Sequence, residues 1–111
     1  MKENRAIRYL SMATKAGKLI VGAEECEKAV KKGKGGLLVV ASDAAPNADR
    51  LAAALAASKR VRLMKSFYTK SEIAAAVGRG SAVALALVTD GGLAEAFASA
   101  AVNGMEQEER I

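Results

Sequence analysis

The sequence predicts an α/β domain in which helices cover both faces of a small, largely parallel sheet. Two observations predict it: segments with the apolar spacing of helices alternate with short apolar runs typical of strands, and the connections between them are short. A length of 111 residues suits one compact domain. We expect this domain to span residues 1–102, followed by an acidic, flexible tail over residues 103–111.

The first part of the chain predicts two helices and two strands. An apolar stripe at helical spacing indicates a helix over residues 3–16. Residues 19–21 form a short apolar strand, and a second helix follows over residues 23–32, directly after Gly22. Residues 37–41 are apolar at every position, which predicts a strand buried on both faces.

The middle of the chain predicts a helix, a strand and a second, shorter helix. Pro46 suits the first position of a helix over residues 47–58, and a mixed strand follows over residues 61–65. The run Thr69-Lys70-Ser71-Glu72 has the spacing of a capping box, which predicts a short helix over residues 70–77.

The last part of the chain predicts one more strand and one more helix. After a tight loop at residues 78–81, the apolar run of residues 83–88 predicts a second central strand. A final helix over residues 91–101 follows, and Asn103-Gly104 predicts its end.

Charge is distributed unevenly. Residues 1–89 carry 16 basic and 7 acidic side chains, a net charge of +9. Residues 90–111 carry one basic and five acidic side chains, a net charge of −4, so the chain as a whole is at +5. Such a basic body favours a polyanionic partner, of which nucleic acid is the commonest, although a basic surface also serves solubility alone.

Composition excludes several classes of site. The chain has no His and a single Cys, which excludes His-based acid–base chemistry, a Cys/His metal site and an internal disulfide. We therefore expect no cofactor, no metal and no enzymatic activity. The uncharged run of residues 80–89 is too short to cross a bilayer, so we expect a cytoplasmic protein with no membrane partner.

Two short segments carry side chains capable of chemistry, and each has a simpler structural interpretation. Ser42-Asp43 follows a central strand, where open α/β sheets bind ligands, but both side chains are also typical of turns, which we favour. Cys26 lies on the inward face of its predicted helix. The neighbouring Glu25 and Glu27 raise a thiol pKa, so a buried apolar role is favoured over a reactive one.

Glycine-rich segments give no phosphate-binding motif. Neither G-x-G-x-x-G nor G-x-x-x-x-G-K-[ST] occurs, and residues 33–36 predict a turn between a helix and a strand. Gly91-Gly92 opens a helix and is able to hold an anion there, but Asp90 beside it repels one. A nucleotide-binding enzyme is the weakest of the functional hypotheses.

The start of the second helix is the most informative segment. Its free backbone N–H groups, just after Gly22, are able to meet a phosphate or a base edge. Lys28 lies one turn beyond Glu24 and Glu25. Acidic residues at the start of a helix and basic ones at its end are also what the helix dipole favours, and charge order alone leaves both interpretations open.

Several segments together resemble a known family. They read Leu10-x-Met12-Ala13-x-Lys15-Ala16-Gly17-Lys18-Leu19-x-x-Gly22, then Lys28-Ala29-Val30-x-x-Gly33, then the run from Leu37 to Pro46, and finally Thr69-Lys70 and Gly78. In this order they resemble the L7Ae/L30e family of kink-turn-binding ribosomal proteins, in particular its small stand-alone bacterial members. The resemblance covers about the first 100 residues. It implies a three-layer α-β-α sandwich with a four-stranded mixed sheet, and binding to RNA kink-turns with tandem sheared G·A pairs.

The resemblance also implies which residues contact RNA. The family signature Gly-x-Asn-Glu-x-x-Lys is matched by Gly22, Glu25 and Lys28, where the Glu accepts from a guanine edge and the Lys donates to guanine or backbone. Glu24 replaces the Asn. A carboxylate cannot donate a hydrogen bond and repels phosphates, a loss of about 2–4 kcal/mol of binding free energy.

A second contact region implied by the resemblance is the loop before the last strand. Here it contains Arg79, Gly80 and Ser81, and Arg79 takes the place of an apolar side chain that packs on an extruded base. Arg79 suits stacking or a phosphate contact, with a solvated loop charge as the alternative. Lys70 matches a position of backbone contact. Four further lysines add attraction that is independent of sequence: Lys15, Lys18, Lys31 and Lys32.

The sequence thus predicts a non-catalytic protein that binds structured RNA, a kink-turn or ribosomal RNA, with no DNA partner expected. The predicted RNA-binding residues are Gly22, Glu24, Glu25, Lys28, Lys31, Lys32, Lys70, Arg79, Gly80 and Ser81. Proteins of the ribosome or of RNA processing are further expected partners. The alternative is a protein-interaction module associated with the translation or RNA-processing machinery.

Overall fold

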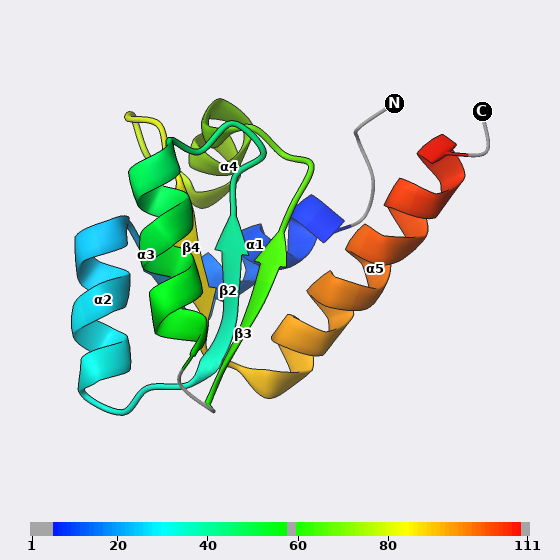
Figure 1. Cartoon of the computed structure of the whole chain (residues 1–111). Helices are drawn as coiled ribbons and strands as arrows, with labels where there is room; N and C mark the ends of the chain where they lie inside the picture. The colour runs from blue at the N-terminus through cyan, green and yellow to red at the C-terminus, as the bar shows by residue number, and fades with distance from the viewer. Residues whose placement is uncertain (1–5, 58–59, 110–111) are drawn as a thin grey trace.

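The computed structural model describes residues 6–57 and 60–109. Every predicted helix and strand is present, in the predicted order (Figure 1). The elements are α1 (Ala6–Lys15), β1 (Leu19–Val21), α2 (Ala23–Lys31), β2 (Gly36–Val40), α3 (Pro46–Ala56), β3 (Val61–Lys65), α4 (Lys70–Val77), β4 (Leu85–Val88) and α5 (Gly91–Glu109). The predicted helix residues 3–5 before α1 and 58 after α3 fall outside the described residues.

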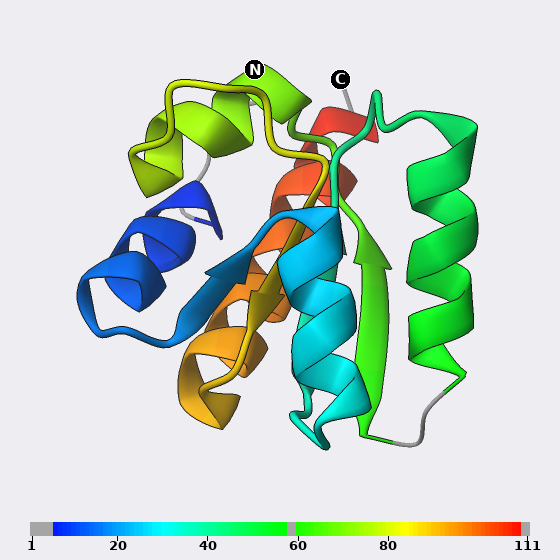
Figure 2. The same ribbon diagram turned by 90° about the vertical axis from the view of Figure 1, so that its left-hand side faces the viewer.

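The four strands form one mixed sheet in the order β1-β4-β2-β3 (Figures 1 and 2). β2 pairs with β3 in parallel, whereas β4 is antiparallel to both β1 and β2. The four-stranded mixed sheet that the family resemblance implies is confirmed, and the largely parallel sheet predicted from alternation alone is wrong. After β3 the chain forms α4, which packs on α1, and it returns to the sheet beside the end of β2. There the Ala41 amide donates to the Ala84 carbonyl over 2.9 Å, and β4 runs back along β2 in the opposite direction.

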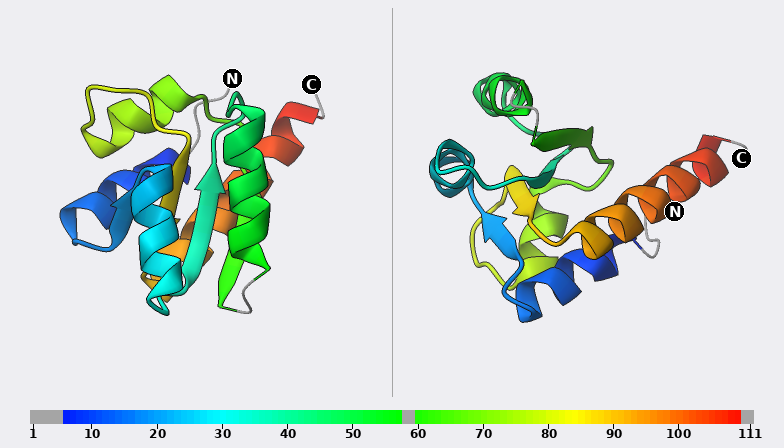
Figure 3. Two further views of the ribbon diagram at one scale, coloured as in Figure 1. Left: turned by 60° about the vertical axis from the view of Figure 1, so that its left-hand side comes forward. Right: turned by 90° about the horizontal axis from the view of Figure 1, so that it is seen from below.

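Helices cover both faces of the sheet, as predicted. Figure 3 shows α2 and α3 on one side and α1, α4 and α5 on the other. β2 divides its side chains between two apolar clusters: Leu37 and Val39 face α1, α4 and α5, while Leu38 and Val40 face α2 and α3. None of the four is more than 1% exposed. The strand is therefore buried on both faces, as its unbroken apolar run predicts.

The ends of α4 are fixed by side-chain and backbone capping. The Glu72 amide donates to Oγ1 of Thr69 over 3.1 Å, and the Thr69 amide donates to Oε1 of Glu72 over 2.8 Å, so the predicted capping box is confirmed. At the other end Gly78 has a φ of 75°, in the left-handed region, and the Arg79 amide donates to the Ala74 carbonyl. This cap sets the direction in which the loop after α4 leaves the helix.

The last helix is longer than predicted. The predicted stop at Asn103-Gly104 is wrong, because α5 continues through both residues to Glu109. A single Gly inside a helix costs only about 1 kcal/mol relative to Ala, and alanines before it support the helix. The boundary between a domain and an acidic tail at residue 102 stays a prediction. In the part of the chain that the structure describes, no helix is both long enough and apolar enough to span a membrane.

Candidate nucleic-acid interface

Two segments that are about sixty residues apart in the sequence line one hollow of about 340 Å³. One is the end of β1 and the start of α2, and the other is the loop between α4 and β4. Figure 2 shows this loop passing beside the N-terminal end of α2 on its way to β4. The lining residues are Val21, Gly22, Ala23, Arg79, Gly80, Ser81, Ala82, Val83 and Ala84. Four of the ten predicted RNA-binding residues therefore surround a single concave surface.

Gly22 shapes the α2 side of this hollow. It is the residue before the helix and has a φ of 101°, a conformation that side chains disfavour. Its amide donates to the Leu85 carbonyl over 2.9 Å, and this hydrogen bond joins the start of the helix to β4. Its carbonyl accepts from the Cys26 amide, the first hydrogen bond of the helix. The described residues supply no side-chain cap for α2. The first N–H groups of the helix thus remain directed at the hollow's edge.

The loop on the other side is anchored at both ends. Gly78 fixes its start, and the Val83 amide donates to the Lys70 carbonyl over 3.1 Å near its end. Between these anchors Arg79, Gly80 and Ser81 are exposed. The loop therefore presents one guanidinium and small residues beside the α2 terminus.

Glu24, Glu25 and Lys28 form an exposed charge cluster on the first turns of α2. Nζ of Lys28 lies 3.3 Å from Oε1 of Glu24 and 3.8 Å from Oε2 of Glu25. The three side chains are 58–79% exposed, so these ion pairs contribute little to stability. The Lys28 ammonium, which the sequence predicts to contact RNA, is therefore shared by two carboxylates.

The remaining predicted lysines do not join the hollow. Lys70 begins α4 and its backbone amide donates to Oδ1 of Asp43, while its side chain does not line the hollow. Lys31 and Lys32 lie at the other end of α2, about 13 Å from Gly22 along a nine-residue helix. Lys31 pairs there with Glu27 over 3.1 Å.

Ser42-Asp43 is a turn and Cys26 is buried, as predicted. Ser42 and Asp43 form a turn, in which the Asp43 carboxylate caps α4 as described above. Asp90 caps α5, because the Leu93 amide donates to its Oδ2 over 2.8 Å. The side chain of Cys26 is fully buried, and burial raises its pKa to about 12, with the nearby Glu25 carboxylate adding to the rise. A protonated, buried thiol is not a nucleophile.

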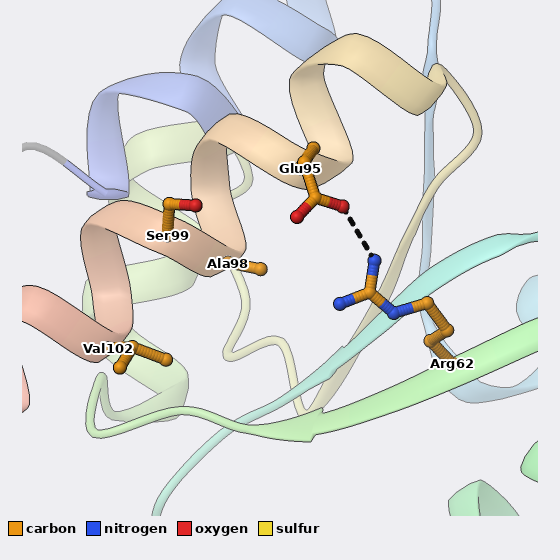
Figure 4. Close-up of a pocket in the computed structure, with 5 residues that line it drawn as sticks. All are labelled: Arg62, Glu95, Ala98, Ser99 and Val102. Carbon is orange, nitrogen blue, oxygen red and sulfur yellow. Dashed lines mark hydrogen bonds and ion pairs between the residues drawn. The ribbon is translucent and has the colours of Figure 1, made fainter.

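A second hollow, of about 310 Å³, lies between β3 and α5. Figure 4 shows Arg62 reaching from the strand to Glu95 on the helix, with a 2.9 Å ion pair between them. Ala98, Ser99 and Val102 complete the lining. The sequence analysis missed this hollow, because no motif marks it. Among the described residues no group of His, Cys, Asp or Glu side chains is arranged to hold a metal ion.

Two solved structures share this fold. A protein of unknown function from Bacillus halodurans C is 23% identical, with a TM-score of 0.74 over 87% of this chain and 96% of its own. The 15.5kD RNA binding protein of Giardia lamblia is 22% identical, with a TM-score of 0.62 over 84% of this chain and 78% of its own. A search of curated protein sequences gives no significant match.

The family is shown by sequence. The model of the Ribosomal protein L7Ae/L30e/S12e/Gadd45 family matches residues 5–98, which is most of the chain. The match extends from α1 into α5, as far as Ala98, and includes both segments that line the first hollow. The chain therefore belongs to the Ribosomal protein L7Ae/L30e/S12e/Gadd45 family.

Proposed function

We propose that the protein is a non-catalytic RNA-binding protein that holds structured RNA between the start of α2 and the loop after α4. Family membership supports this proposal, as does the fold it shares with an RNA binding protein of Giardia lamblia. The observation that carries it is the hollow itself, because it joins Gly22 to Arg79, Gly80 and Ser81.

The chemistry of the hollow suits an unpaired base and its phosphate. Val21, Ala23 and Ala82 offer apolar surface for the face of a base. Arg79 lies at the same surface, where a guanidinium stacks on a base or pairs with a phosphate. The uncapped N–H groups of α2 add donors for a phosphate oxygen.

Glu25 and Lys28 extend the proposed contact beyond the hollow. A carboxylate accepts from the N–H groups of a guanine edge, and an ammonium donates to guanine or to phosphate oxygens. In this proposal the RNA is a kink-turn or a ribosomal RNA element with sheared G·A pairs. Glu24 makes binding weaker than an Asn in its place.

The test is a titration against a kink-turn RNA and against the same RNA with its G·A pairs replaced by Watson–Crick pairs, over a series of salt concentrations. The proposal predicts preference for the first RNA that persists as salt rises, because base contacts are less salt-dependent than phosphate contacts. Equal binding that disappears steeply with salt would leave only a basic surface. Binding to neither RNA would contradict the proposal.

A protein-interaction module is the alternative, and the edge of the sheet favours it. β3 is an edge strand with no further neighbour in the described sheet, and Leu63 on it is 45% exposed. An extended segment of a ribosomal or RNA-processing protein is able to pair with such an edge. Capture from lysate with and without nuclease separates the two functions, since partners that depend on RNA are lost when the RNA is digested.

A further inference from the structure

A row of basic residues lies at the end of the sheet opposite to the first hollow. β1, β2 and β3 all run in one direction, and each begins shortly after a basic residue: Lys18, Lys34 and Arg60 respectively. All three side chains are exposed. We call these three residues the basal row. The hollow lies where β1 ends and α2 begins, at Gly22, whereas the basal row lies where the strands begin. The two surfaces are therefore at opposite ends of the sheet.

Backbone contacts hold the basal row together across the sheet. The Thr89 amide donates to the Lys18 carbonyl over 2.9 Å, and Gly36 lies against the backbone of Val88 and Thr89. The Gly36 amide in turn donates to the Arg60 carbonyl over 3.0 Å. Neighbouring strands are about 4.8 Å apart, so the three steps from β1 to β3 spread the row over about 14 Å.

The charge at this end is strongly positive. Lys15, Lys31 and Lys32 are exposed at the same end of the molecule, on the last turns of α1 and α2. Glu27, which pairs with Lys31, and Asp90 offset two of these six positive charges, so the end keeps a positive excess. A row of several cations over this distance fits a chain of phosphates better than one small anion.

The surface of α2 between the basal row and the hollow is acidic. Glu24, Glu25 and Glu27 are 79%, 63% and 38% exposed along the helix. Glu24 and Glu25 both pair with Lys28, and Glu27 pairs with Lys31. This surface therefore offers no net positive charge to an RNA strand. A single strand running along α2 from one end to the other meets repulsion, and the two ends therefore suit two separate RNA segments.

We infer that the basal row is a second RNA contact, which takes the phosphodiester backbone of an RNA helix irrespective of its sequence while the hollow holds the first RNA. The protein then bridges two RNA segments. The bridging of two RNA segments rests on the proposed function of the hollow, whereas the basal row as an RNA contact does not. The basal row is distinct from the hollow in position and in chemistry, because it supplies side-chain cations and no concave surface for a base.

The experiment is a fluorescence binding assay with the full chain. An unlabelled kink-turn RNA is added at one equivalent, and capture of a fluorescent blunt RNA duplex without G·A pairs is then measured. The variant K18Q/K34Q removes two charges from the basal row. The matched control R8Q/R50Q removes two exposed charges from α1 and α3, outside both the basal row and the lining of the hollow.

The inference predicts that wild type and control capture the duplex, and that K18Q/K34Q weakens capture about tenfold while lowering kink-turn affinity no more than the control does. The slope of log K against log salt for the duplex is expected to fall by about 1 to 2. Equal weakening by both variants would overturn the inference, because only net charge would matter. Capture of polyglutamate but not of the duplex would overturn it in favour of an acidic protein partner.

The assay separates this inference from the proposed function. If wild type binds the kink-turn RNA but never captures the duplex, the basal row is not an RNA contact and the function of the hollow is unaffected. If wild type captures the duplex without preferring the kink-turn RNA, the hollow fails and the basal row stands.

Discussion

Nζ of Lys28 lies 3.3 Å from Oε1 of Glu24, one helical turn away on the exposed start of α2. The pair links the position where this chain departs from the family signature to the position that we propose donates to RNA. Any RNA that takes the Lys28 ammonium must separate it from Glu24 and leave that carboxylate near phosphates. We therefore expect Glu24 to weaken binding in two ways, by competing for the cation and by repelling the ligand.

Replacing this carboxylate tests the relationship. Glu24→Asn is expected to strengthen kink-turn binding by about 2–4 kcal/mol, because it adds a donor, removes a charge that repels phosphates and leaves Lys28 paired with Glu25 alone. Isothermal titration at fixed salt measures the change. Glu27→Gln is the matched control, since it removes the same charge from the Lys31 pair, farther along α2. Similar strengthening by both variants would show that only the net charge of α2 matters.

Arg79 tests the loop side of the hollow. Arg79→Ala is expected to weaken RNA binding by about 1–3 kcal/mol while leaving the fold intact, because the side chain is exposed. Filter binding or fluorescence anisotropy gives the affinity, and Arg8→Ala on α1 removes an equal charge away from the hollow. If the two variants bind RNA equally well, the loop charge plays no special part.

Gly22 tests the backbone that frames the hollow. Gly22→Ala forces a side chain into a φ of 101°, and we expect it to lower the free energy of unfolding by about 1–3 kcal/mol. Urea denaturation measures the loss. Gly80→Ala makes a suitable comparison, because a Cβ there meets open space and no left-handed backbone is required. Equal stability of the two variants would mean that the start of α2 adjusts without strain.

The buried thiol of Cys26 is expected to make the free energy of unfolding depend on pH. Burial raises the pKa of its thiol from 9.0 to about 12, so above pH 9 the unfolded chain loses a proton that the folded chain retains. The free energy of unfolding is then expected to fall by about 1.4 kcal/mol per pH unit between pH 9 and 12. Below pH 9 the thiol contributes no pH dependence.

The measurement compares wild type with Cys26→Ala, which lacks the titrating group. The difference between their unfolding free energies should narrow as the pH rises through this range. A difference that stays constant from pH 8 to 11 would mean that the thiol ionises equally well in both states.

The sequence predicted the elements better than their directions. The capping box at Thr69 and the unbroken apolar run of β2 are local signals, and both features are present as predicted. The antiparallel direction of β4 depends on where α4 packs against α1, which no local pattern encodes. The continuation of α5 past Gly104 likewise depends on the rest of the helix rather than on that residue.

In the candidate site, too, local signals were predicted from the sequence and tertiary relationships were not. The motif around Gly22 marked the start of α2, and the family resemblance added Arg79, Gly80 and Ser81. That these residues line one hollow is a tertiary relationship, made by the Gly22–Leu85 and Val83–Lys70 hydrogen bonds. Lys31 and Lys32 are separated from that hollow by the length of α2. The sequence predicted this length, so their distance from Gly22 could also have been predicted.

The most direct test of the central claim is a residue-by-residue map of RNA contact on the ¹⁵N-labelled protein by NMR. Addition of kink-turn RNA is predicted to shift the amides of Ala23, Glu24, Gly80 and Ser81 first and most strongly, because they border the hollow between α2 and the loop after α4. Amides of Arg62, Glu95 and Ser99, around the other hollow, should stay in place. Strong shifts at that second group, with the first unmoved, would contradict the account.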